Sequence, residues 1–173
     1  MTEQATFQLI AVVAGGLIAI TGGFLSNTLL ERQRLRRETR NLALAFQGEI
    51  TAILELIQER NYLARFEQVI GEIEASREPF YMPFRIRFKY DPVFQANVGS
   101  LGLLPPPLSR EIPLFYTRLA SVLEDLVSIG DGTYSQLDVP TLLRVYRDSL
   151  AAIRRMISQG ESITRAIADK YGG

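Results

Sequence analysis

Apolar residues recur with a helical period along most of the 173-residue chain. They follow one another at steps of three and four residues over 42–57, 63–73, 112–129 and 143–157, with charged residues between them, and the heptad register of the last series continues to 171. That spacing places the apolar side chains on one face of an α-helix. We therefore expect an all-α fold in which these amphipathic segments bury their apolar faces against one another.

Helix-breaking residues divide this pattern into separate helices. Pro79 and Pro83 end the first region, which has a kink near Asn61. The sequence GDGT at 130–133 predicts a turn with a glycine C-cap. Asp138 is suited to cap the last helix, with Pro140 in its first turn. Because the helices differ in length and the loops are short, we expect an antiparallel helical bundle.

The segment FRIRFKY, at 84–90, alternates apolar and basic residues and therefore has the period of a strand. We interpret residues 80–91 as an extended strap, and three roles for it remain open. Its apolar side closes the bundle, or its aromatic and basic residues rest at a membrane interface, or its edge joins the sheet of a partner or second copy. The strap residues considered for the last two roles are Phe84, Arg85, Arg87, Phe88, Lys89 and Tyr90.

The most apolar part of the chain lies near its N-terminus. Residues 7–30 carry no ionisable side chain, and 12 of these 24 residues are Leu, Ile, Val or Phe. At about 1.5 Å per residue such a helix extends about 36 Å, enough to cross a hydrocarbon core of about 30 Å. The preceding MTEQAT lacks the basic residues of a signal peptide, and AGGLIAITGGF lacks the spacing of a phosphate-binding loop. The run predicts a transmembrane helix.

Small residues line part of this predicted helix at spacings that bring them to one face. Such residues let two membrane helices approach closely, where packing rather than the hydrophobic effect drives association. Small residues at every fourth position from Ala11 to Gly23 suit a right-handed helix crossing, whereas those at steps of four, three and four from Gly15 to Ser26 suit a left-handed crossing. The partner is either a second copy or a larger membrane complex. The candidate interface residues are Ala11, Gly15, Ala19, Gly22, Gly23 and Ser26.

A basic segment follows the apolar run at once. Excess Arg on one side of a spanning helix places that side in the cytoplasm, so we expect an inner-membrane protein with its N-terminus outside. The arginines act as a topology signal, contact lipid headgroups, or bind an acidic partner. They are Arg32, Arg34, Arg36, Arg37 and Arg40. The predicted organisation is a short external N-terminus at 1–6, a membrane helix at 7–30, an Arg-rich helical segment at 31–41 and a cytoplasmic helical domain at 42–173.

Composition limits the chemistry. The chain has 19 basic and 19 acidic residues and no Cys, His or Trp. This composition excludes disulfides, thiol nucleophiles, Cys or His metal ligands and His-based catalytic triads. The carboxylates have no metal-site spacing, and we expect Arg144, Arg147, Arg154 and Arg155 to pair with Glu on neighbouring helices. We predict no catalytic residue, cofactor, metal or small-molecule substrate, and the neutral charge balance argues against nucleic acid.

One short pattern resembles a group of small, uncharacterised single-pass bacterial membrane proteins with helical cytoplasmic domains. It reads Y-x6-N-x4-GLLP-x2-L-x2-EI-x2-FY over 90–116, and in it we expect Leu103 and Leu104 to dock the loop on the bundle. The resemblance implies an anchored helical protein and assigns no activity or site residue. From the predicted membrane helix, the helical domain and the lack of catalytic residues, we expect the protein to be a non-enzymatic accessory or scaffolding subunit. The alternative is a membrane-tethered sensory domain, which requires a concave pocket with convergent polar groups.

Overall fold

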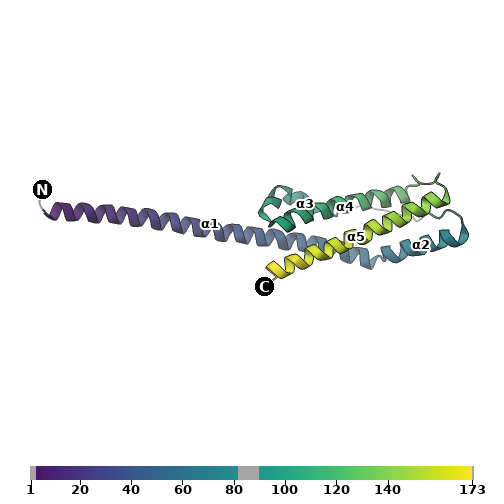
Figure 1. Cartoon of the computed structure of the whole chain (residues 1–173), viewed down its shortest axis with the longest axis horizontal. Coiled ribbons are helices and arrows are strands. Elements are labelled where there is room, and N and C mark those ends of the chain that lie inside the picture. The colour runs from purple at the N-terminus through teal and green to yellow at the C-terminus, as the bar shows by residue number, and fades with distance from the viewer. Residues whose placement is uncertain (1–2, 82–89, 173) are drawn as a thin grey trace. The chain divides into compact units, whose positions relative to one another are not determined.

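The computed structural model describes residues 3–81 and 90–172, with side chains in the first helix placed from residue 28 onward. Within these residues the chain is helical, with no strand, as the sequence predicts (Figure 1). The elements are α1 (Glu3–Glu59), α2 (Tyr62–Ser76), α3 (Pro92–Asn97), the 3-10 helix η1 (Val98–Leu103), α4 (Pro106–Gly130) and α5 (Val139–Tyr171).

The chain divides into two compact units, Met1–Arg40 and Asn41–Gly173. The first consists of the N-terminal part of α1, and the second holds the rest of α1 together with all the other elements. The helix has no break until Glu59, in agreement with the expectation that it continues through the Arg-rich segment.

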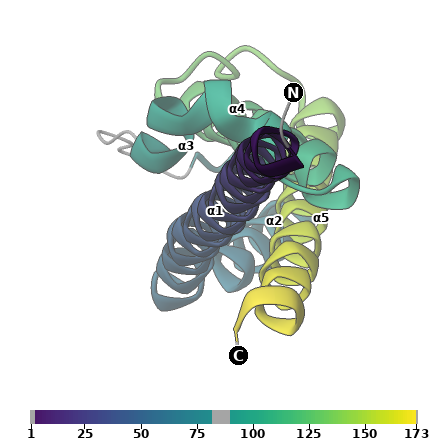
Figure 2. The same cartoon turned by 90° about the vertical axis from the view of Figure 1, so that its left-hand side faces the viewer.

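The second unit is a helical bundle around one apolar core, with α4, α5 and the α1–α2 pair surrounding it (Figures 1 and 2). In α4, all six residues of the predicted stripe are buried, and Leu108 and Tyr116 join them. In the other helices the stripe is confirmed in part, because Ile57, Leu63 and Ile157 are only half-buried. The buried stripe of α4 consists of Ile112, Phe115, Leu119, Val122, Leu126 and Ile129.

The helix directions differ in one respect from the predicted antiparallel bundle. α5 runs antiparallel to α1 and α2, as two contacts show. Gln47 of α1 donates a hydrogen bond to the carbonyl of Thr164, late in α5 (3.2 Å), whereas Glu74 of the later helix α2 pairs with Arg147, early in α5. The C-terminal part of α1, by contrast, runs parallel to α4 (Figure 1). They do so because α3 and the start of α4 lie beside α1, at the end of the bundle opposite the C-terminal end of α2 (Figure 1).

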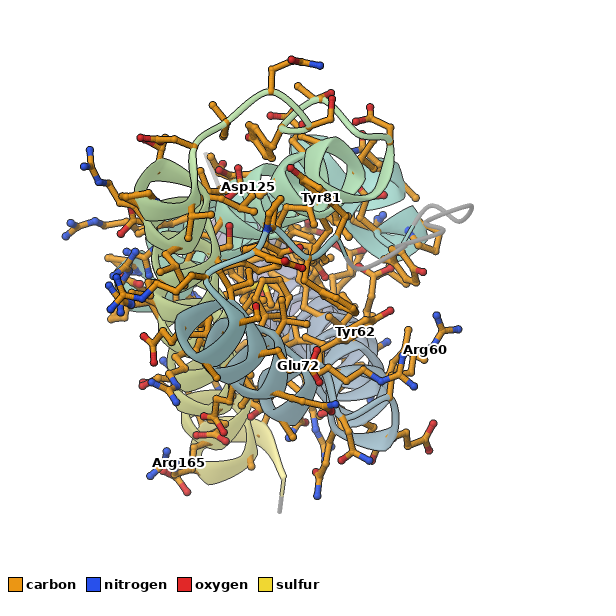
Figure 3. All side chains as sticks on the ribbon, turned by 90° about the vertical axis from the view of Figure 1, so that its right-hand side faces the viewer. Arg60, Tyr62, Glu72, Tyr81, Asp125 and Arg165 are labelled. Atoms are coloured by element: carbon orange, nitrogen blue, oxygen red, sulfur yellow. The ribbon has the colours of Figure 1, made fainter. Side chains whose placement is uncertain are left out.

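The predicted kink near Asn61 is confirmed as a full break between α1 and α2. Asn61 has φ 52° and ψ 38°, the left-handed conformation that Asn tolerates better than most residues. Arg60 and Tyr62 flank the break (Figure 3), and the guanidinium of Arg60 donates to the Tyr62 hydroxyl at 3.3 Å. The break lets α2 follow α5 at a new angle while the apolar face stays turned inward.

The turn between α4 and α5 forms where it is predicted. α4 ends at Gly130 with Asp131 as its C-cap, and Gly132, the next residue, takes the left-handed conformation (φ 83°) of a helix-ending glycine. Asp138 caps α5 as predicted, since its Oδ1 accepts from the backbone N–H of Thr141 at 3.1 Å. Hydrogen bonding from the Thr141 side chain, and then from its backbone N–H, lowers the pKa of Asp138.

Gly160 lies at a close contact among three helices. A Cβ placed on Gly160 of α5 would lie 2.9 Å from Cε2 of Phe115 in α4. It would also lie 3.1 Å from Cδ2 of Leu54 and 3.3 Å from Cγ2 of Ile50, both in α1. The absence of a side chain at 160 is therefore a packing requirement of the core.

Candidate interaction sites

The predicted membrane face belongs to the first unit. Within the part of the chain that the structure describes, no helix is sufficiently long and apolar to cross a bilayer. The side chains of the predicted small-residue interface lie outside the described part, although their backbone is helical within α1. These residues are Ala11, Gly15, Ala19, Gly22, Gly23 and Ser26.

The end of the predicted membrane segment and the Arg-rich segment are described. Leu29 and Leu30 are 58% and 63% exposed, and Leu35 is exposed among the arginines. Five arginines and two glutamates between residues 31 and 40 leave a net charge of +3. Arg34 forms an ion pair with Glu38 one turn farther along the helix, at 2.8 Å. This short stretch of α1 thus presents both apolar and cationic side chains to its surroundings.

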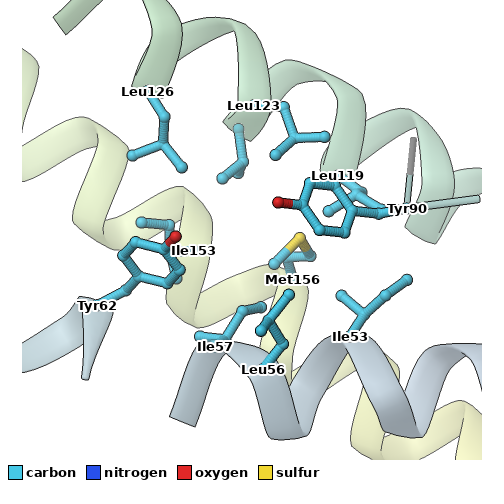
Figure 4. A pocket seen from close by; sticks show the side chains of 11 residues that line it. Ile53, Leu56, Ile57, Tyr62, Tyr90, Leu119, Leu123, Leu126, Ile153 and Met156 are labelled. Atoms are coloured by element: carbon cyan, nitrogen blue, oxygen red, sulfur yellow. The ribbon is translucent and has the colours of Figure 1, made fainter. Parts of the chain in front are cut away.

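Most of the predicted strap lies outside the described residues, including Phe84, Arg85, Arg87, Phe88 and Lys89. Tyr90 is described and half-buried, and it lies at one side of an apolar pocket with Tyr62 at the other (Figure 4). Side chains of α1, α4 and α5 form the remaining walls. The pocket has a volume of about 40 Å³, far below the roughly 300 Å³ of the smallest usual ligand sites. It is a packing defect beneath Tyr90 rather than a ligand site.

A carboxylate joins three elements near the start of the second unit. Oε1 and Oε2 of Glu49 in α1 accept the backbone N–H groups of Val93 (2.6 Å) and Phe94 (3.0 Å), at the start of α3. The Tyr116 hydroxyl of α4 also donates to Glu49. Burial, reinforced by the hydrogen bond to Glu49, raises the pKa of Tyr116. The Phe94 ring stacks on Tyr116 at a centroid distance of 4.1 Å, so the polar contacts are covered by aromatic surface.

The loop that carries the sequence resemblance is docked by one leucine rather than two. Leu104 is buried at 4% exposure, as predicted, whereas Leu103 is 41% exposed and the prediction for it is wrong. The two residues are adjacent at the end of η1, where the backbone becomes extended at Leu104 and successive side chains diverge. Leu103 and Val98 leave apolar surface on the outside of η1.

The prediction that four arginines of α5 pair with Glu on neighbouring helices is confirmed for two of them. Arg147 pairs with Glu74, and Arg154 pairs with Glu67, each pair joining α5 to α2 at the surface. Over residues 28–81 and 90–172, no three acidic side chains gather closely enough to hold a metal ion. Among the described residues, the other two predicted arginines, Arg144 and Arg155, have no carboxylate within ion-pair distance. The two observed pairs are exposed, and each contributes about 0–1 kcal/mol to stability.

A second concave site lies between α4 and α5. It is an open groove of about 430 Å³ with both polar and apolar walls. Gln159, only 9% exposed, forms its floor and donates from Nε2 to the carbonyl (3.2 Å) and to Oε2 (2.8 Å) of Glu111. Oε1 of Gln159 accepts from Nη1 of Arg118 at 2.6 Å. A polar chain of Glu111, Gln159 and Arg118 therefore crosses from one helix to the other and back.

Sequence reasoning overlooked Glu49, Arg118, Gln159 and Gly160. Gly160 does lie on the register of α5, seven residues after Ile153 and seven before Ile167, so its position at the core was available from the spacing. A glycine in such a register indicates a close helix contact, and the polar neighbour Gln159 needs partners once it is buried there. Glu49 and Arg118 gave no such signal, because each looks like an ordinary charged residue on a solvated helix face.

Comparison of the chain with protein-family models, with curated proteins and with solved structures found no match.

Proposed function

We propose that this chain is a non-enzymatic, single-pass inner-membrane protein whose helical bundle serves as a cytoplasmic interaction module. In this proposal residues 7–30 span the membrane, residues 1–6 lie outside and the bundle lies inside. The protein associates with a larger membrane complex, or with a second copy, through its small-residue membrane face and its bundle.

The uncharged run followed at once by arginines is the observation that carries the proposal. Twelve Leu, Ile, Val and Phe residues lie in that run. At roughly −0.3 to −0.6 kcal/mol each in the middle of a spanning helix, they contribute about −4 to −7 kcal/mol toward insertion. The exposed Leu29, Leu30 and Leu35 among cationic residues suit the boundary between hydrocarbon and headgroups.

The surface of η1 supports the role of the bundle as an interaction module. The Glu49 contacts hold α3, and with it η1, against α1 and α4. Val98 and Leu103 are 47% and 41% exposed on η1. A fixed loop with exposed apolar side chains is a better docking surface than a mobile one, because less conformational entropy is lost on binding. We propose this loop as the contact for a protein partner.

Alkaline extraction of membranes tests the anchoring. The wild-type chain is expected to remain with the lipid pellet. Introducing Ile18→Arg and Ile20→Arg adds roughly 5–7 kcal/mol at the middle of the span and is expected to release the chain. The matched control, Leu30→Arg, lies at the end of the span next to the native arginines and is expected to stay inserted. Release of the wild type, or retention of the double variant, would contradict the proposal.

The small-residue face has its own test. Gly15→Leu combined with Ala19→Leu adds bulk where a second helix is proposed to approach. The double variant is expected to lose co-purification with its partner, or with a tagged second copy, in mild detergent. Leu17→Ile and Ile18→Leu change other positions of the helix and should preserve association. Unchanged association of the double variant would refute this role of the face.

A further inference from the structure

The groove between α4 and α5 brings two arginines to one concave surface of the second unit. Arg118 comes from α4 and Arg155 from α5, and the hydroxyl-bearing residues Ser158 and Ser162 line the same groove. Its volume of about 430 Å³ lies within the roughly 300–1,000 Å³ of small-molecule sites. It meets the expectation of a concave site with convergent polar groups that a ligand-binding bundle requires.

Arg118 is held in place by a hydrogen bond to Gln159. Its Nη1 donates to Oε1 of Gln159 at 2.6 Å, and the Gln159 amide is itself oriented by its two hydrogen bonds to Glu111. The guanidinium has five N–H groups in a rigid plane, and this contact uses one end of it. Since Gln159 is buried and its partners are fixed, Arg118 is pre-organised, and a ligand meets a lower entropic cost of ordering it.

Arg155 differs from its neighbours on α5. Arg147 and Arg154 pair with Glu74 and Glu67 of α2, on another side of the helix. Among the described residues, Arg155 has no carboxylate within ion-pair distance, and it faces the groove. Its positive charge is therefore available to an anion that enters between the two helices.

The walls of the groove restrict the kind of anion. Arg118 and Arg155 are opposed by Glu111 alone, which leaves a net charge of +1 among the lining residues. A dianion would experience the Glu111 carboxylate as a repulsive neighbour, whereas a monoanion matches the balance. Pro107, Leu108 and Ile163 add apolar surface beside the charged groups. The groove thus combines a site for one negative charge with a surface for a short hydrocarbon chain.

From this geometry we propose that the α4–α5 groove binds a small monocarboxylate with an apolar body. The carboxylate lies between the guanidinium groups of Arg118 and Arg155, where planar, charge-assisted hydrogen bonds form, and Ser158 or Ser162 donates to a remaining lone pair. The apolar body lies along Leu108 and Ile163. The site is separate from the proposed membrane anchor and from the η1 loop, so it does not depend on either role.

Saturation-transfer NMR with hexanoate tests this site, using the full chain in nanodiscs of zwitterionic lipid and empty nanodiscs as the blank. Hexanoate is expected to bind at millimolar concentration and to saturate. Arg155→Gln is expected to weaken binding roughly tenfold, because it removes a charge-assisted hydrogen bond. Arg118→Gln is expected to do the same. Arg154→Gln, on the same helix but paired with Glu67, is the matched control and should leave hexanoate binding unchanged.

Two further probes test whether binding requires the negative charge and whether the groove prefers a monocarboxylate to phosphate. Hexanamide has the same apolar body without the charge and is expected to bind at least tenfold more weakly. Inorganic phosphate, added at the concentration of hexanoate, is expected not to displace it. Equal binding of hexanoate to wild type and to folded Arg155→Gln would overturn the site, with folding checked by circular dichroism. Equal binding of hexanamide, or displacement by phosphate, would overturn the preference for a monocarboxylate.

Discussion

Gly160 offers the sharpest test of the packing, because one methyl group distinguishes two opposite outcomes. In an open helical position, Gly→Ala stabilises a helix by roughly 0.5–1 kcal/mol. At 160 the new Cβ would lie 2.9 Å from the ring of Phe115, which is fully buried. Leu54 is able to move its flexible end, but the Phe115 ring is fully buried, so moving it displaces its packed neighbours. Overpacking of this kind costs roughly 1–3 kcal/mol.

Subtracting the helix gain from the packing cost leaves Gly160→Ala less stable by about 1 kcal/mol. Gly48 and Gly71 are matched controls, since both are helical and a Cβ at either would have nothing within 4 Å. Gly48→Ala and Gly71→Ala should each stabilise the chain. Thermal unfolding of the full chain, followed by helical circular dichroism, should lower the Tm of Gly160→Ala by roughly 3–5 °C and raise it for the controls. A Gly160→Ala protein as stable as Gly48→Ala would refute the close contact.

Three other residues give predictions of their own. Arg77→Gly should raise stability by about 0.5–1 kcal/mol in the same melts, because Arg77 has φ 60° at the C-cap of α2. Glu49→Ala should cost roughly 2–3 kcal/mol and speed hydrogen exchange at 93–97, with Tyr116→Phe as a milder control that keeps the α3 contacts. The pKa of Asp138 is lowered from 3.8, so its stabilisation is present above pH 3.8 and is lost as the pH falls through the lower folded value. Asp138→Asn should reduce the acid-dependent fall in Tm, and an unchanged pH profile would count against the cap.

The apolar period predicted the buried residues well where every third or fourth side chain of a helix packs against a neighbouring helix. All six stripe residues of α4 are buried because this helix has neighbours along its whole length and every third or fourth side chain meets them. In α1 and α5 the stripe fails at Ile57 and Ile157, which are half-buried. In α1, the break at Asn61 follows Ile57 and redirects the chain. In α5, Met156 and Gly160 are buried beside Ile157, so the buried face includes residues that the predicted stripe omits.

The spacing of apolar residues did not predict the helix directions or the polar contacts. Apolar spacing indicates which face of a helix is buried, but not at which end of the bundle α4 begins, and this decides that α4 runs parallel to α1. It also does not distinguish a solvated Glu from Glu49, whose role depends on the start of α3 coming within hydrogen-bond distance. The groove has the same origin, since Arg118 and Gln159 come from different helices and meet only after folding.

Cysteine labelling tests the central claim of a single membrane crossing most directly, because the native chain has no Cys to interfere. Thr2→Cys marks the short N-terminal segment, and Asp169→Cys marks an exposed position near the end of α5. With a membrane-impermeant maleimide on intact spheroplasts, the account predicts that Cys introduced at 2 is labelled and Cys introduced at 169 reacts only after lysis. Labelling at 169 in intact spheroplasts, or protection of position 2 until lysis, would contradict the proposed membrane crossing or its orientation.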